Sequence, residues 1–258
     1  MGVRITYNFD DWDAATVTAS SSSASELGAA NVIDPQPSKV WRSTGDTAEW
    51  VKFDLGSAKQ ITCIGLFNFN FTSGATVTLQ ANASDSWGAP SYSQALTIAA
   101  DSDSVVLKRL VYFLDQTYRW WRITIADASN PDGYVEIGRV AAGQYYAPTR
   151  NIQEQYRYQG QDPSERERLP GAWSPSVSRA RYRTADVSFP FANQTQADKF
   201  WAIFDKVGNE TPIILSVEPT TRPSQDSMYC TLETPLSLTN ATLTYWDVVT
   251  LRFEEKVR

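Results

Sequence analysis

The sequence predicts a mainly β protein in two parts. Short alternating or continuous apolar runs are separated by clusters of Gly, Pro, Asn, Asp and Ser along most of the chain, which is the pattern of strands and turns. In the first part these runs recur at the spacing expected of an all-β sandwich. A single helical pattern occurs late in the chain. With 258 residues, the chain is long enough for two domains of ordinary size.

Residues 1–146 are expected to form the first domain, a β-sandwich. Two of its strands alternate clearly between apolar and polar side chains. The apolar side chains on the inner faces are Val51, Phe53 and Leu55 in one strand and Trp121, Ile123 and Ile125 in the other. Large indoles fill the space between two sheets, and a short acceptor before Leu-Gly ends a strand in a turn. The residues expected to serve the structure in these ways are Trp41, Trp50, Asp54 and Trp121.

Residues 147–178 lack clear periodicity and are expected to form a linker or arm. Such a segment is longer than an ordinary loop, so it is either mobile or ordered by packing on another surface. Its Tyr and Arg content favours contact, because these side chains are enriched at interface hot spots. A solvated spacer is the alternative. The candidate contact residues are Arg157, Tyr158, Arg166 and Arg168.

Residues 179–258 are expected to form a smaller α+β domain, an antiparallel sheet with one helix. The helix is predicted over residues 194–207, with Asn193 or Thr195 as its N-cap and Gly208 as its stop. Its apolar stripe consists of Ala197, Phe200, Trp201, Phe204 and Val207. The domain opens with a strand that carries three arginines on one face, which either contact acidic neighbours or are solvated. These arginines are Arg179, Arg181 and Arg183.

Bulk properties exclude several classes of partner. The net charge of −6 and the pI near 4.8 argue against nucleic acid, because phosphate binding requires clustered Lys and Arg. Membrane insertion is not expected, since no stretch approaches the roughly 20 apolar residues of a span. Cys63 and Cys230 are far apart in the sequence, so neither a disulfide framework nor zinc spacing is present.

Catalysis is not expected. The chain contains no histidine, which removes Ser-His and Cys-His nucleophile pairs and histidine metal sites. It also lacks a glycine-rich phosphate loop, and we expect no cofactor. The carboxylates of Asp10, Asp11 and Asp13 cluster around Trp12 and could serve a glycosidase. A short acidic turn of this kind is, however, usually solvated.

Five short motifs follow one another through the first domain. They are A-x-x-hydrophobic-D at residues 30–34, W-x-S at 41–43, W-hydrophobic-x-hydrophobic-D-L-G at 50–56, an arginine-aromatic strand at 118–123 and hydrophobic-x-E-hydrophobic at 134–137. In this order they resemble the discoidin family, also called coagulation-factor C-type or galactose-binding-like domains. The resemblance implies a jelly-roll β-sandwich.

The resemblance also implies binding of sugars, or of membrane lipids and proteins, by loops at one end of the sandwich. The comparable loops here are residues 43–48 and 84–93. The candidate ligand-binding residues are Trp87, Tyr92 and Arg42. An exposed Trp87 would stack on a sugar ring, whereas the structural alternative is that it covers the rim of the core.

A structural calcium is common in sugar-binding members and would map to Asp34 and Glu136. The turn at residues 34–38 lacks the usual glycine and second aspartate. We therefore expect neither an oxygen-rich shell nor a bound metal.

The passage from residues 133–143 into an arm and a small α+β domain resembles minor or distal tail proteins of long-tailed bacteriophages. That resemblance implies a virion protein of the tail tip or baseplate, made in the bacterial cytoplasm. It would form a homo-oligomeric ring, six-membered by likeness to distal tail proteins or three-membered by likeness to hub proteins. Its partners would be other tail proteins, with the outward sandwich contacting them or a cell-surface glycan. The alternative is a stand-alone carbohydrate-binding, lectin-like protein.

Overall fold

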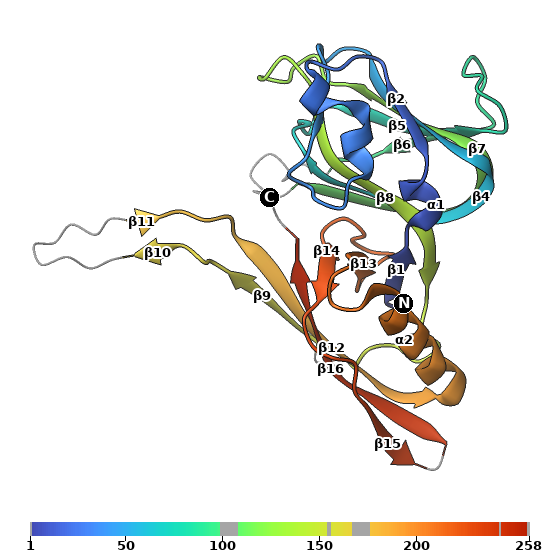
Figure 1. Cartoon of the computed structure of the whole chain (residues 1–258), viewed down its shortest axis with the longest axis vertical. Helices are drawn as coiled ribbons and strands as arrows, with labels where there is room; N and C mark the ends of the chain where they lie inside the picture. The colour runs from blue at the N-terminus through green and yellow to red at the C-terminus, as the bar shows by residue number, and fades with distance from the viewer. Residues whose placement is uncertain (1, 99–107, 154–155, 167–175, 243, 257–258) are drawn as a thin grey trace, which may run out of the picture. The chain divides into compact units, whose positions relative to one another are not determined.

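The computed structural model describes residues 2–98, 108–153, 156–166, 176–242 and 244–256 (Figure 1). The chain is mainly β, as predicted. It forms two compact units, Met1–Pro148 with Ile213–Tyr229 and Thr149–Pro212 with Cys230–Arg258. Residues 213–229 were expected in the C-terminal domain. They belong to the first unit because β13 (Ile213–Ser216) pairs with β1 (Arg4–Asn8).

The first unit is organised by a long strand, β4 (Glu49–Phe69). Both halves of β4 pair with β7 (Arg109–Ala126), and its second half also pairs with β8 (Glu136–Tyr146). Within this unit the strand order is β6-β5-β7-β4-β8-β1-β13. The shorter strands that complete it are β2 (Thr16–Ala19), β3 (Trp41–Arg42), β5 (Thr76–Asn82) and β6 (Tyr92–Leu96).

The core of this unit lies between the inner faces of its strands. Trp12, Trp41 and Trp121 are fully buried there. The Trp12 ring lies 4.4 Å from that of Phe53 and 6.3 Å from that of Trp121, between centroids. Trp50 was predicted to lie in the core, but it is only partly buried. Its neighbour Val51 in β4 points inward, so strand alternation places Trp50 outside.

The acidic turn is the helix α1 (Asp10–Asp13), and two of its three carboxylates form ion pairs. Asp11 pairs with Lys59 at 2.7 Å, and Asp13 pairs with Arg139 at 2.8 Å. Arg139 is buried and also donates a hydrogen bond to the carbonyl of Ile33. Burial raises the pKa of the Asp13 carboxyl, against the opposing effect of Arg139. Two short 3₁₀ helices follow, η1 (Ser25–Leu27) and η2 (Ala29–Ile33).

The second unit is an antiparallel sheet with one helix, as predicted. Its sheet order is β14-β16-β12-β9, with β15 on β16. The strands are β9 (Arg157–Gln161), β12 (Tyr182–Asn193), β14 (Ser227–Leu232, from Cys230 onward), β15 (Leu238–Thr242) and β16 (Tyr245–Glu255). The expected arm is thus partly β structure, because β9 pairs with β12. Residues 165–166 and 176–177 form a further ladder, β10 (Glu165–Arg166) with β11 (Ser176–Val177) (Figure 1).

The helix α2 (Gln194–Val207) begins and ends as the sequence predicts. The Asn193 side chain accepts a hydrogen bond from the Gln196 N–H at 2.8 Å, and Gly208 follows the last turn at φ +51°. Phe200 packs on Phe189 of β12, with 4.7 Å between ring centroids. Trp201 was expected on this inner face but is 44% exposed.

None of the helices in the described part of the chain is both long and apolar enough to cross a membrane.

Replacement of Gly138 by Ala is expected to destabilise the first unit. A Cβ atom at this position in β8 would lie 2.0 Å from the carbonyl oxygen of Pro37, and a backbone oxygen cannot turn aside. We expect a loss of about 2–3 kcal/mol in the free energy of unfolding, measured by urea denaturation. The control is Gly88→Ala, because nothing lies within 4 Å of its added Cβ. Equal stability of the two variants would contradict the packing described here.

Candidate functional site

The outer face of β2, β4, β7 and β5 carries an ordered array of polar and aromatic side chains. Alternate residues of these strands point away from the core, and the pairing register places them in three rows. The rows are Thr78–Thr124–Trp50, Gln80–Arg122–Lys52–Thr18 and Asn82–Trp120–Asp54–Thr16. The loop after β5 adds Trp87 to this surface. The name indole face is used below for Trp50, Lys52, Trp87, Trp120 and Arg122.

Lys52 lies between two indoles of this face. Its Nζ atom is 5.3 Å from the ring centroid of Trp120 and 5.7 Å from that of Trp50. The same ammonium pairs with Asp85 at 2.7 Å, and its hydrogen bond holds the pKa of that carboxyl below the usual value. Both indoles are partly exposed. The strands and the Asp85 contact therefore fix a cation with an aromatic ring on either side.

Trp87 stacks on Arg122 and is partly exposed. The Arg122 Cζ atom lies 4.5 Å from the Trp87 ring centroid, and the indole Nε1 donates to Asp85 Oδ1 at 2.6 Å. Arg122 also donates to the Gln80 Oε1 atom from Nε at 2.9 Å and from Nη2 at 2.7 Å. These contacts place Trp87 on side chains of the outer face, so the described contacts do not support a role at the core rim.

Asp54 and Arg119 border the indole face. Arg119 donates to both carboxylate oxygens of Asp54, at 2.7 and 2.9 Å, and lies 5.2 Å from the Trp120 ring centroid. This ion pair holds the pKa of Asp54 below its usual value. Asp54 also accepts the N–H of Gly56, whose φ is +72°. Asp54 was predicted to end a strand in a turn, but β4 continues through Gly56 to Phe69, with a register shift against β7 between Asp54 and Lys59.

Tyr92, the second expected ligand residue, packs against the hydrophobic core. Its ring lies 6.5 Å from that of Trp121, and burial raises the pKa of its hydroxyl. Tyr92 thus supports the sheet beneath the indole face.

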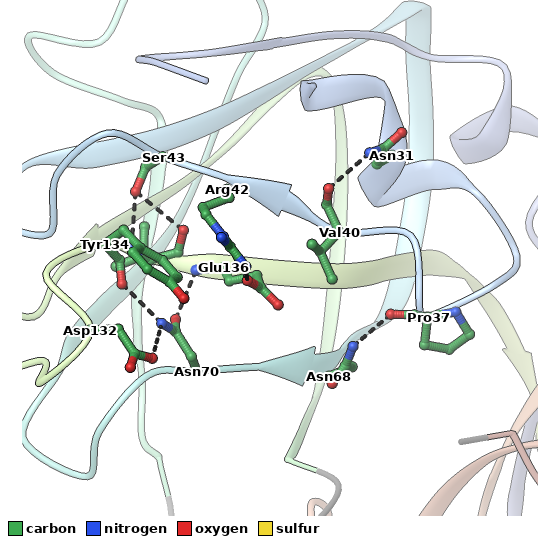
Figure 2. Close-up of polar contacts among 11 residues, drawn as sticks. Asn31, Pro37, Val40, Arg42, Ser43, Asn68, Asn70, Asp132, Tyr134 and Glu136 are labelled. Atoms are coloured by element: carbon green, nitrogen blue, oxygen red, sulfur yellow. Dashed lines mark hydrogen bonds and ion pairs between the residues drawn. The ribbon is translucent and has the colours of Figure 1, made fainter. Parts of the chain in front are cut away.

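Arg42 belongs to a separate polar cluster, shown in Figure 2. Its guanidinium donates to Glu136 Oε2 from Nε and Nη2, at 2.9 and 2.8 Å, and lies 4.3 Å from the Tyr134 ring centroid. The Asn70 amide bridges the same cluster, donating to the Tyr134 carbonyl and to Asp132 and accepting the Glu136 N–H. Arg42 is therefore engaged by its own chain.

The two expected ligand loops begin beside different positions of β7, one near its end at Ile125 and the other at Trp120 within the strand. Residues 43–48 lead into Glu49, which pairs with Ile125. Residues 84–93 follow Asn82, which pairs with Trp120. The structure therefore separates Arg42 from Trp87, and it groups Trp87 with sheet residues that the sequence analysis missed. The missed residues are Lys52, Trp120 and Arg122.

The residues around the opening turn do not fit a calcium ion. Asp34 pairs with Lys39 at 2.6 Å, and Glu136 pairs with Arg42. Backbone oxygens of the turn also accept side-chain donors, from Asn68 to Pro37 at 2.6 Å and from Asn31 to Val40 at 2.8 Å (Figure 2). Among the described residues, no group of three or more acidic or cysteine side chains could hold a metal. The oxygens that calcium requires are occupied by the chain's own donors.

The expected interface residues of the second unit mostly have partners within the chain. Arg179 pairs with Glu165 at 2.9 Å, Arg181 with Asp162 at 3.0 Å and Arg183 with Glu255 at 3.1 Å. Tyr158 and Arg157 lie in β9, where the Tyr158 ring contacts Tyr156 and Arg157 pairs in register with Asp186. Arg166 lies in β10. Arg168 lies outside the described residues.

The chain is similar to several solved structures of binding modules. Among solved structures it resembles chitosan-binding module 1 of a chitosanase/glucanase from Paenibacillus sp. IK-5, at 18% identity over 50% of this chain and 95% of that one, with a TM-score of 0.40. It also resembles a fucose-binding module, SpX-3, from Streptococcus pneumoniae, at 12% identity over 52% and 96% of the two chains, with a TM-score of 0.39. The third is the family 32 CBM of C. perfringens NanJ in complex with galactose, at 13% identity over 55% and 99%, with a TM-score of 0.40.

No curated protein matched the sequence. A family model described as F5/8 type C domain matches residues 16–137. This range contains every motif on which the discoidin resemblance was based and the strands that carry the indole face. Residues 16–137 therefore form an F5/8 type C domain, the discoidin-like module that the motifs predicted.

Proposed function

We propose that the F5/8 type C domain binds glycans at its indole face. The observation that carries the proposal is the grouping of three partly exposed tryptophans around Lys52 and Arg122 on one sheet surface. Indole rings present large, rigid apolar faces, against which the C–H face of a sugar ring can stack. The hydroxyl and amide groups of the neighbouring rows supply donors and acceptors for sugar hydroxyls.

The face is also held in place before any ligand arrives. Asp85 accepts from both Lys52 and the Trp87 indole, and Gln80 accepts from Arg122. These contacts link the loop to the strands, so little side-chain freedom is lost on binding. The role proposed for the domain is recognition, and no catalytic step is part of it.

Trp87→Ala is expected to weaken glycan binding by about tenfold or more, which corresponds to about 1.4 kcal/mol of lost stacking. The measurement is isothermal titration with oligosaccharides selected by a glycan array. Trp246→Ala is the control, since it removes a partly exposed indole from the other unit and outside the apolar side chains considered below. If Trp87→Ala binds as tightly as the wild type, or if no glycan on the array is retained, the proposal is wrong.

We propose self-association of the second unit as a second function. Among the described residues, every large apolar side chain that is strongly exposed lies in this unit, distributed over β11, β12, α2 and β16. These side chains are Val177, Phe191, Trp201 and Val249. A second copy of the chain is the proposed occupant, and the ring of a virion tail tip is the assembly that the sequence predicts. Closed rings require heterologous interfaces.

For the full chain, light scattering after size exclusion is expected to give a closed oligomer, with rings in negative-stain images. Trp201→Ser should lower the oligomer mass, because a polar side chain there removes apolar contact area. Trp87→Ala should leave the mass unchanged. A wild-type chain that stays monomeric at all accessible concentrations would rule out this assembly.

A further inference from the structure

We infer that the ligand of the indole face is an extended acidic polysaccharide, of the hexuronate class. This inference rests on the proposed glycan-binding function and adds the class of ligand to it. Two features of the face carry it, its length and its charge.

The aromatic positions are spread along the strands instead of enclosing a cavity. Trp50 and Trp120 lie in the first and third rows, because Trp120 is in register with Asp54, four residues beyond Trp50 in β4. This offset corresponds to about 13 Å along the backbone, and the two ring centroids lie 5.7 and 5.3 Å from the Lys52 Nζ atom. Lys52 lies between the two indoles. A chain of several sugar units can therefore contact both rings and the cation between them.

The charged groups of the face leave an excess of positive charge. Lys52, Arg119 and Arg122 are cationic, whereas Asp54 and Asp85 are the carboxylates that contact them. Asp54 accepts hydrogen bonds from the Nε and Nη2 atoms of Arg119, and Asp85 accepts from Lys52 and the Trp87 indole. Three cations thus face two carboxylates, in a chain whose net charge is −6.

Arg122 is the group best placed to recognise an anion. Its two assigned hydrogen bonds go to the uncharged Gln80 Oε1 atom, and its guanidinium is stacked on Trp87. Arginine binds carboxylates with paired, charge-assisted hydrogen bonds. Because the guanidinium covers one face of the Trp87 ring, the carboxylate of a uronate beside Trp87 would reach it at the edge of the stacked pair. The corresponding neutral sugar would lack that contact.

The test compares polygalacturonate with its fully methyl-esterified form, because the two share a backbone and differ in charge. Binding of the full chain to each polymer is measured by affinity electrophoresis and titration, at low and high NaCl. We expect at least about tenfold tighter binding of the acidic form at low salt, with the difference shrinking as salt screens the charges. Arg122→Gln should weaken binding of the acidic polymer much more than binding of the ester, so that most of the difference is lost. Arg122→Lys should preserve part of it.

Lys59→Gln is the matched control. It removes one positive charge from the same strand, at a position paired with Asp11 and outside the indole face, so the preference should persist. Thermal unfolding checks that each variant is folded. Equal binding of the two polymers, or a preference that survives Arg122→Gln intact, overturns the inference and leaves glycan binding standing. Failure to bind either polymer overturns the inference, and only the absence of binding to every glycan on the array overturns the proposed function as well.

Discussion

Strand alternation across the paired strands β4 and β7 determines both the core and the candidate site. The same register places Val51, Phe53 and Trp121 inside and Trp50, Lys52 and Trp120 outside. Because side chains alternate with a period of two, a slip of one residue would exchange the two sets. The packing of the core therefore determines which side chains lie on the outer face. The burial of Trp121 requires that its neighbour Trp120 lie on the outer face.

The polar ends of the sandwich are closed by side chains of the chain itself. Lys39 and Arg42 bind the two carboxylates to which a calcium site would map, and Asn31 and Asn68 bind backbone oxygens of the opening turn. On the other side of β8, buried Arg139 joins α1 to this turn. Such fixed donors satisfy oxygens that would otherwise be costly to bury. The cluster around Arg42 thus has a structural role, whereas the indole face has exposed aromatic surface that a ligand can contact.

Much of the fold could be predicted from the sequence, because ordered motifs and hydrophobic periodicity report local structure. They indicated the sandwich, the buried Trp41 and Trp121, and the capped helix α2. Trp50 was predicted in the core because of its size. Its position next to the inward-facing Val51 in the same strand already indicated the outer face. The site itself depends on long-range pairing, such as Lys52 opposite Arg122, and on a loop that carries Trp87 onto that pair. The pairing of β13 with β1 is equally non-local. Periodicity contains no information on such partners.

The central claim is that ligand contacts the outer face of β4 and β7, and indole N–H resonances test it most directly. The chain has nine tryptophans, and each indole gives a separate signal in a ¹⁵N-correlated spectrum once assigned by substitution. On titration with an oligosaccharide, the account predicts shifts for Trp50, Trp87 and Trp120, while buried Trp12, Trp41 and Trp121 show much smaller changes. Saturable shifts confined to other tryptophans, such as Trp201 or Trp246, would contradict it.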